Sequence, residues 1–359
     1  MDMLIHLMQV LMACVILKYS CDQFEQAAGY IGRNMKAGIK GATVNAVGSS
    51  MPEMMAGFAV LFFYDDPALF SIALGITAGS GVFNTAVIPP LAIFFAKDKE
   101  GNAVDSIPLD RYSLIRDVFW VVLSDVLLIG LIFHGSISIG WAVALNLVYV
   151  GYGIHLYRDA VMGGSNETEE YEEEKLPDYG NSLLNVLSCN FNRVLFRDTP
   201  LTQGKAIVLL AIAIVIITLG SHLLVEGVIG TANVFGIPNF ISGLILGAAA
   251  SSIPDTILSI KDAKNGDYED AVANPLASNT FDTSISVGLP LLCWLIWQGE
   301  NSITIVAENM EALRISVVAM SFCVGLTLIY KYKSITRRTA GFILTMYGVW
   351  CTWIWFTYI

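Results

Sequence analysis

Charged residues are scarce in this sequence of 359 residues: Asp, Glu, Lys and Arg make up 14% of it, whereas 55% is hydrophobic. Soluble domains carry about 25% charged residues. Uncharged runs such as Ala206–Thr218 lie within apolar stretches of about 20 residues, the length of a membrane-spanning helix. The sequence therefore excludes a pair of ordinary soluble domains and predicts an all-α polytopic membrane protein.

Basic residues, histidine and cysteine are also few. The 20 Lys and Arg against 31 Asp and Glu give a net charge of −11, which argues against a nucleic-acid partner. The six cysteines form no CxxC pair and the four histidines lack metal-ligand spacing, so we expect no disulfide framework, zinc site or cofactor. No HExxH or GxSxG motif occurs, which argues against an intramembrane hydrolase; we expect no enzyme activity.

Ten apolar segments are predicted to span the bilayer. They lie at residues 3–31, 41–64, 68–96, 114–133, 136–157, 204–233, 240–261, 268–297, 310–330 and 339–358. If the connections alternate between the two sides, 18 of the 20 Lys and Arg lie in or beside those on one side, and this side is expected to be cytoplasmic. We therefore expect both termini outside, in the cell membrane (plasma or inner), with the lipid bilayer as partner. The sequence indicates no oligomeric state.

One long polar connection, residues 158–203, divides the predicted spans into two sets of five. It contains the acidic run Asn166–Lys175, which is typical of a solvated, flexible segment. We interpret residues 1–157 and 204–359 as two five-helix halves joined by an acidic cytoplasmic loop.

The two halves resemble each other at their most polar intramembrane points. Gly48-Ser-Ser-Met-Pro-Glu53 matches Ala250-Ser-Ser-Ile-Pro-Asp255, and Ser80-Gly-Val-Phe-Asn-Thr85 matches Ser278-Asn-Thr-Phe-Asp-Thr283. The first repeat covers about residues 41–96 and the second about 240–297. With five spans per half, the two copies enter the membrane in opposite directions. Inverted repeats of this kind are typical of secondary transporters, whose substrate site lies where the repeats meet.

The repeats supply a set of oxygen ligands inside apolar spans. Buried carboxylates are costly and are therefore functional candidates. The candidate ligands are Glu53, Asp255, Asp282, Asn84, Ser49, Ser50, Ser80, Ser251, Ser252 and Ser278. Oxygen-only ligation favours hard cations such as Na⁺, K⁺ and Ca²⁺ over zinc or copper. Pro52 and Pro254 would each remove a helix hydrogen bond and release a carbonyl one turn earlier.

Other intramembrane acids lie outside the repeat blocks. Asp22, Glu25 and Glu226 are near span ends, where water could solvate them. Asp125 is in the middle of the fourth span without an obvious partner; it could line a secondary proton or ion path, or pair with a polar group that the sequence does not identify.

The paired blocks resemble the two repeats of the sodium/calcium exchanger superfamily, and the Glu53/Asp255 pair with Ser-Asn-x-Phe-Asp282 is similar to its potassium-dependent branch. His222–Gly227 and Arg116-Asp117 add local similarity. The resemblance implies antiport of Ca²⁺ against Na⁺ by alternating access. It implies that Glu53 and Asp255 are the central ligands, completed by Asn84, Asp282 and the repeat serines, and that the first and sixth spans slide against the repeat core.

The sequence departs from this family at Gly81, where Asn is usual, and at Ala250 and Ala277, where Gly is usual. A Ca²⁺/H⁺ exchanger, or a carrier of another divalent cation such as Mg²⁺, remains an alternative on the same fold; a channel fits paired inverted repeats less well. The charges of Glu53, Asp255 and Asp282 sum to −3 when ionised. One Ca²⁺ with one K⁺ would neutralise them, as would three Na⁺, whereas Ca²⁺ alone would require one protonated acid.

Overall fold

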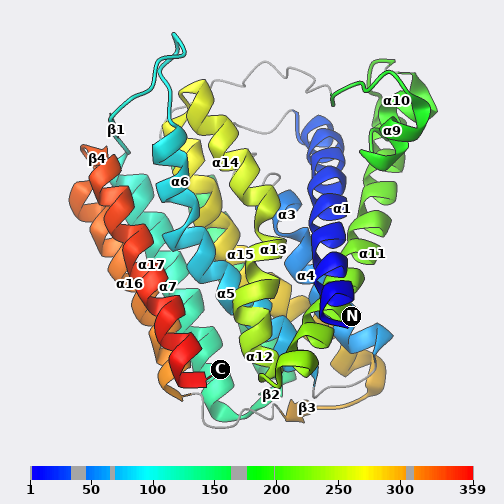
Figure 1. The fold of residues 1–359 in the computed structure, drawn as a ribbon, viewed down its shortest axis with the longest axis vertical. Helices are drawn as coiled ribbons and strands as arrows, with labels where there is room; N and C mark the ends of the chain where they lie inside the picture. Colours follow the sequence, from blue (N-terminus) through cyan, green and yellow to red (C-terminus); the bar gives the residue numbers. More distant parts are fainter. Residues whose placement is uncertain are drawn as a thin grey trace.

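Figure 1 shows a bundle of helices in a computed structural model that describes residues 2–33, 46–64, 69–162, 176–197, 199–304 and 311–358. The acidic run Asn166–Lys175 and residues 41–45 of the second predicted span lie outside these residues. The first half contains α1 (Asp2–Ile31), α3 (Ala46–Ser49), α4 (Met51–Phe58), η2 (Ala59–Phe63), α5 (Phe70–Ala86), α6 (Ile88–Phe95), α7 (Arg111–His134) and α8 (Ile139–Met162).

The second half follows two short helices, α9 (Ser182–Leu187) and α10 (Phe191–Phe196). It contains α11 (Gln203–Phe235), α12 (Asn239–Ser242), η4 (Gly243–Gly247), α13 (Ala248–Ser251), α14 (Ile253–Asn265), α15 (Tyr268–Gln298), α16 (Glu311–Lys331) and α17 (Arg337–Tyr358). Each of the ten predicted spans therefore coincides with a helix or with a series of helices.

Not every span is a long, uniformly apolar helix. Six helices of the described residues are long and apolar enough to cross a membrane, and the bent pair Asn239–Ser251 and Ile253–Asn265, with an angle of 42° between its parts, raises the number to seven. Met51–Phe63 and Ile315–Lys331 are shorter apolar helices. The protein is therefore an integral membrane protein. Its helices α5 and α15 are mostly buried, and the buried residues include polar ones, so polar groups lie inside the helix bundle.

Two small sheets reveal the inverted repeat. Strand β1 (Ser106–Ile107) pairs antiparallel with β4 (Ile335–Thr336), and β2 (Ser136–Ser138) pairs antiparallel with β3 (Ser302–Thr304). Each sheet joins a connection of one half to the non-equivalent connection of the other. The two sheets lie at opposite ends of the bundle, and both termini lie at the end that carries β2 and β3 (Figure 1). This exchange is the arrangement expected for two copies related by inversion of their direction.

The long helices α1 and α11 pack against each other through small residues. A Cβ atom at Gly227 would lie 3.0 Å from the carbonyl oxygen of His6 and 2.8 Å from Cγ2 of Val10, and one at Gly220 would lie 3.0 Å from Leu17. Missing side chains let helix backbones approach closely inside a membrane. The glycines of α11 therefore make α1 and α11 a closely packed pair at one side of the bundle.

A second close contact joins the two repeats directly. A Cβ at Gly79 of α5 would overlap the carbonyl group of Leu244, and one at Gly243 would lie 2.6 Å from the carbonyl oxygen of Ile72. Gly75 and Gly247 extend this contact by one turn on each helix. The sequence contains a Gly-xxx-Gly motif in each partner, and this spacing is typical of crossing membrane helices.

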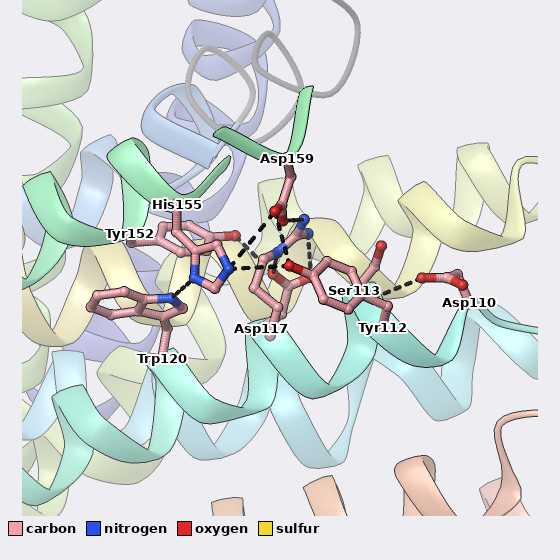
Figure 2. A network of polar contacts seen from close by, with 9 residues as sticks. Asp110, Tyr112, Ser113, Asp117, Trp120, Tyr152, His155 and Asp159 are labelled. Atoms are coloured by element: carbon pink, nitrogen blue, oxygen red, sulfur yellow. Dashed lines mark hydrogen bonds and ion pairs between the residues drawn. The ribbon is translucent and has the colours of Figure 1, made fainter. Parts of the chain in front are cut away.

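Figure 2 shows the polar network that holds α7 against α8. The Arg116 guanidinium donates to Asp117 Oδ1 (2.8 Å) and to Asp159 Oδ2 (3.0 Å), while Tyr152 also donates to Asp117 Oδ1 (3.2 Å). Trp120 Nε1 is 3.0 Å from Nδ1 of His155. The Arg116-Asp117 pair noted in the sequence thus has a structural role: it satisfies a nearly buried carboxylate while fixing the ends of two helices.

Candidate functional site

The second and seventh predicted spans are each broken at the repeat motif. Ser50 separates α3 from α4 with φ −92° and ψ 3°, and Ser252 separates α13 from α14 with φ −82° and ψ 8°. Pro52 and Pro254 follow in the first turn of the next helix, where proline is tolerated because its missing N–H is not needed. Both motifs therefore form the same interruption, which exposes helix ends in the middle of the protein.

The first repeat places Ser80 of α5 at the centre of one polar cluster. The Ser80 hydroxyl lies 3.2 Å from Glu53 Oε1 and 2.9 Å from Asp282 Oδ2, both of which are acceptors, and 3.0 Å from the Ser252 hydroxyl. The Asn84 amide lies 3.3 Å from Ser80 Oγ and 3.4 Å from Asp282 Oδ2. Residues from both repeats thus meet around one hydroxyl group.

The second repeat forms the corresponding cluster around Ser278 of α15. Its hydroxyl donates to Asp255 Oδ1 over 2.9 Å and lies 3.3 Å from the hydroxyl of Ser49. Ser251 also faces Glu53, and Ser50 faces Asp282. All ten residues that the sequence identified are brought together, and each is at most 1% exposed.

Several oxygen atoms of this site are without a hydrogen-bond partner among the described residues. They are Glu53 Oε2, Asp255 Oδ2, Asp282 Oδ1, Asn84 Oδ1 and Ser50 Oγ. No ion pair found within the described ranges involves any of the three carboxylates. A buried, unpaired carboxylate is costly unless it is protonated or binds a cation. The chemistry of the donor set therefore fits a hard cation held by carboxylate, amide and hydroxyl oxygens.

The three acids do not converge on one point. In the part of the chain that the structure describes, no group of three or more His, Cys, Asp or Glu side chains is placed to hold a single metal ion. Glu53 and Asp282 share the hydroxyl of Ser80, whereas Asp255 is bound to Ser278. An ion in this site would therefore be bound by a mixed set of ligands rather than by a three-carboxylate cage.

The structure also reveals contacts that the sequence analysis missed. Ser221 of α11 donates to the carbonyl oxygen of Pro52 over 3.1 Å, and the thiol of Cys14 in α1 lies 3.9 Å from the carbonyl oxygen of Ala250. The pair α1 and α11 therefore contacts the backbone of both helix breaks. The only signal in the sequence is a small polar residue inside each apolar span, and this is too common to identify such a contact.

The sequence analysis also did not identify the contact made by Asn279 of α15. Its amide donates to the carbonyl oxygen of Gly81 over 2.8 Å, across the interface between the repeats. Gly81 is the repeat counterpart of Asn279, so this contact joins equivalent positions of the two copies, one through its backbone and the other through its side chain. Aligning the two repeats position by position could have identified this pair.

Inverted repeats with broken helices around buried carboxylates define a secondary transporter. A family model described as sodium/calcium exchanger protein matches residues 5–158 and 205–356. The chain belongs to the sodium/calcium exchanger family.

Two solved structures and one relative illustrate the similarity. The H⁺/Ca²⁺ exchanger CAX matches with a TM-score of 0.67 at 17% identity, over 96% of this chain and 81% of that chain. The sodium-calcium exchanger NCX_Mj matches with a TM-score of 0.55 at 23% identity, over 97% of this chain and 98% of that chain. Sodium/potassium/calcium exchanger 4 of Mus musculus is 31% identical over 134 residues, which cover 36% of this chain and 21% of the relative. The protein is thus an antiporter of the Na⁺/Ca²⁺ or Ca²⁺/H⁺ exchanger kind.

Proposed function

We propose that the protein exchanges Ca²⁺ for Na⁺, with K⁺ carried together with Ca²⁺, by alternating access to the site between the repeats. The observation that carries this proposal is the set of buried, unpartnered oxygens contributed by Glu53, Asp255, Asp282 and Asn84 within the described residues. Ca²⁺ takes six to eight oxygen ligands, and Na⁺ and K⁺ use the same ligand types. Hydroxyl groups of the repeat serines complete the ligand set.

The charge of the site supports a monovalent ion beside Ca²⁺. Asp282 occupies the position that Asn84 holds in the first repeat, so the second repeat carries one additional carboxylate. Three ionised acids give −3, which one Ca²⁺ and one K⁺ neutralise, as do three Na⁺. A residual charge inside a low-dielectric site is costly. Exchange of one Ca²⁺ plus one K⁺ for three Na⁺ would therefore leave the site neutral in both states.

The packing of α1 and α11 supports an alternating mechanism. These helices contact the two breaks through Cys14 and Ser221, and they contact each other through glycines. Movement of this pair against the repeat core would open the site to one side and then to the other, while the pair itself remained intact. The contacts at the breaks would change during that movement.

The distribution of basic residues supports one orientation in the membrane. The end of the bundle that carries α9 and α10 is opposite to the end with both termini (Figure 1). Connections at the first end hold most of the Lys and Arg, as the sequence analysis found, and such connections face the cytoplasm. We therefore assign the termini to the outside and residues 158–203 to the cytoplasm of a cell (plasma or inner) membrane.

Flux of radioactive Ca²⁺ into proteoliposomes tests the coupling ion. Purified protein is reconstituted, the membrane potential is clamped, and Ca²⁺ uptake is measured with an outward gradient of Na⁺, of H⁺ or of neither, each with and without K⁺. Uptake that requires the Na⁺ gradient and increases with K⁺ on the Ca²⁺ side supports the proposal. Uptake driven by the H⁺ gradient alone would instead establish the Ca²⁺/H⁺ alternative.

The variant Asp282→Asn tests the potassium assignment. It gives both repeats the same neutral amide, so we expect Na⁺-driven Ca²⁺ uptake to persist while the response to K⁺ weakens or disappears. The double variant Asn84→Asp/Asp282→Asn is the matched control, because it restores the total charge and moves it to the other repeat. A K⁺ titration in which Asp282→Asn equals the wild type would remove Asp282 from the potassium site.

A further inference from the structure

Asp125, in the middle of α7, is a buried acid outside the repeat motifs. Its side chain is 1% exposed, and Oδ2 has no hydrogen-bond partner within the described ranges. No Lys, Arg or His of the described residues forms an ion pair with it. Asp117, two turns earlier on the same helix, shows the usual solution, since it is paired with Arg116. Asp125 therefore lacks the counter-charge that a buried carboxylate requires.

The other carboxylate oxygen of Asp125 points toward a small space beside Gly81 of α5. A Cβ built at Gly81 would lie 3.7 Å from Asp125 Oδ1 and 3.8 Å from Cγ2 of Thr283, with nothing nearer. These are ordinary van der Waals distances, so the missing methyl group leaves room for an atom of that size. Asp125 Oδ1 and the methyl group of Thr283 thus border the position of this missing methyl group.

The groups around this space are polar and uncharged. The Thr283 hydroxyl of α15 lies 2.7 Å from that of Ser124 in α7. The Ser321 hydroxyl of α16 faces Asp125. Hydroxyl groups from α7, α15 and α16 therefore lie around Asp125, and no Lys, Arg or His of the described residues pairs with it. This is the ligand chemistry of a hard cation.

This oxygen cluster lies directly behind the transport site. Gly81 follows Ser80 and Thr283 follows Asp282, so neighbouring faces of α5 and α15 contribute to the two places. The corresponding helix of the second half, α16, has no acid in its middle, so Asp125 has no equivalent there. An ion bound at Asp125 would lie next to the helices that hold the transported ions.

We propose that Asp125 and the space beside Gly81 form a second ion-binding site, which holds one monovalent metal cation of the Na⁺ class. One carboxylate among neutral oxygens is neutralised by one positive charge, whereas a divalent ion would leave a buried excess. The inference rests on the proposed antiport for its role in the cycle. The occupancy of the site is independent of transport and can be measured separately.

Equilibrium binding of radioactive Na⁺ and Ca²⁺ to the purified full-length chain in lipid nanodiscs tests the site. We expect Asp125→Asn to bind about one Na⁺ fewer than the wild type and to keep its Ca²⁺ affinity, because the ligands around Ser80 and Ser278 are intact. The matched control is Asp117→Asn, the same change on the same helix at an acid that already has a partner; it should retain the full Na⁺ stoichiometry.

A second variant tests the site even if Asp125→Asn fails to fold. Gly81→Ala keeps every charge and adds a methyl group where the ion is expected. It should weaken Na⁺ binding at this site about fivefold, the equivalent of about 1 kcal/mol of crowding. An unchanged Na⁺ stoichiometry in folded Asp125→Asn, or unchanged Na⁺ affinity in Gly81→Ala, overturns the proposal.

Two further outcomes separate this proposal from the proposed function. If Asp125→Asn alters proton release on ion binding but not the number of Na⁺ bound, the occupant is a proton and the cation site is rejected. If the wild type binds the additional Na⁺ through Asp125 but shows no Na⁺-driven Ca²⁺ flux, the second site is supported and the proposed exchange is not. Glu53→Gln provides the converse reference, since it should lose Ca²⁺ binding and keep the ion at Asp125.

Discussion

The two repeats are alike in the geometry of their candidate ligands and unlike in their charge. In the first, Ser80 binds Glu53 over 3.2 Å; in the second, Ser278 binds Asp255 over 2.9 Å. The breaks at Ser50 and Ser252 differ by about 10° in φ and 5° in ψ, as their torsions show. Both repeats therefore share the same local structure, in which a serine and an acid meet at a helix break.

The differences lie within one turn of these serines along α5 and α15. Asn84 corresponds to Asp282, and Gly81 corresponds to Asn279, whose amide donates to the Gly81 carbonyl oxygen. The comparison indicates that symmetry is kept where both copies must form the same helix break. It is lost where the site requires a particular total charge, because charge is a property of the assembled site and not of either copy.

The largest effect is expected when either central acid is neutralised. Glu53→Gln and Asp255→Asn should each reduce Na⁺-driven Ca²⁺ uptake by at least about 100-fold, since loss of a charged partner in a buried ion site costs on the order of 3 kcal/mol. Uptake into proteoliposomes measures this. Glu226→Gln, at an exposed acid of α11, is the control and should behave as the wild type. A large difference between the two central variants would show that the repeats do not contribute equally.

A crosslink between α1 and the core should stop turnover while sparing ion binding. A Cβ at Gly48 would lie 3.0 Å from Cδ1 of Phe24, so a short bis-methanethiosulfonate reagent, which forms a reducible disulfide with each thiol, can bridge Phe24→Cys and Gly48→Cys in a background without the native cysteines. We expect transport to cease on crosslinking and to return after reduction, with bound Ca²⁺ unchanged. Mass spectrometry verifies the bridge.

The control for this experiment joins α1 to α11 instead. Ile16→Cys and Gly220→Cys lie at the contact between these helices, where a Cβ at Gly220 would be 3.0 Å from Ile16 Cγ2. If the two helices move together, this bridge should leave turnover largely intact. Full turnover with the α1-to-core bridge in place would contradict a sliding pair.

The smallest effect concerns stability rather than transport. Gly79→Ala places a methyl group against the backbone of η4 and should lower the stability by about 1–3 kcal/mol, measured as a lower midpoint of thermal unfolding in detergent. Gly130→Ala in α7, where a Cβ would meet nothing within 4 Å, is the matched control. It should be neutral or slightly stabilising, because alanine favours the helix. Equal midpoints for both variants would argue against the close packing of α5 on η4.

The sequence by itself determined the class of this protein and the candidate ligands of its proposed site. Scarce charge and apolar runs required a membrane bundle, because a chain without enough polar surface cannot be soluble. The paired motifs identified Glu53, Asp255 and the serines around them, because an acid and a proline at repeat-matched positions inside an apolar span are too costly to be incidental. The apolar runs also predicted the helix positions to within a few residues.

Only the tertiary structure decided which of these groups touch one another. Contacts such as Ser221 with Pro52, Asn279 with Gly81 and Asp125 with the Gly81 space join helices that are far apart in the sequence. Hydrophobic periodicity fixes which segments are helical, but it carries no information on which face meets which partner. In a membrane, that choice depends on close backbone packing and on satisfying each buried polar group, and both depend on the assembled bundle.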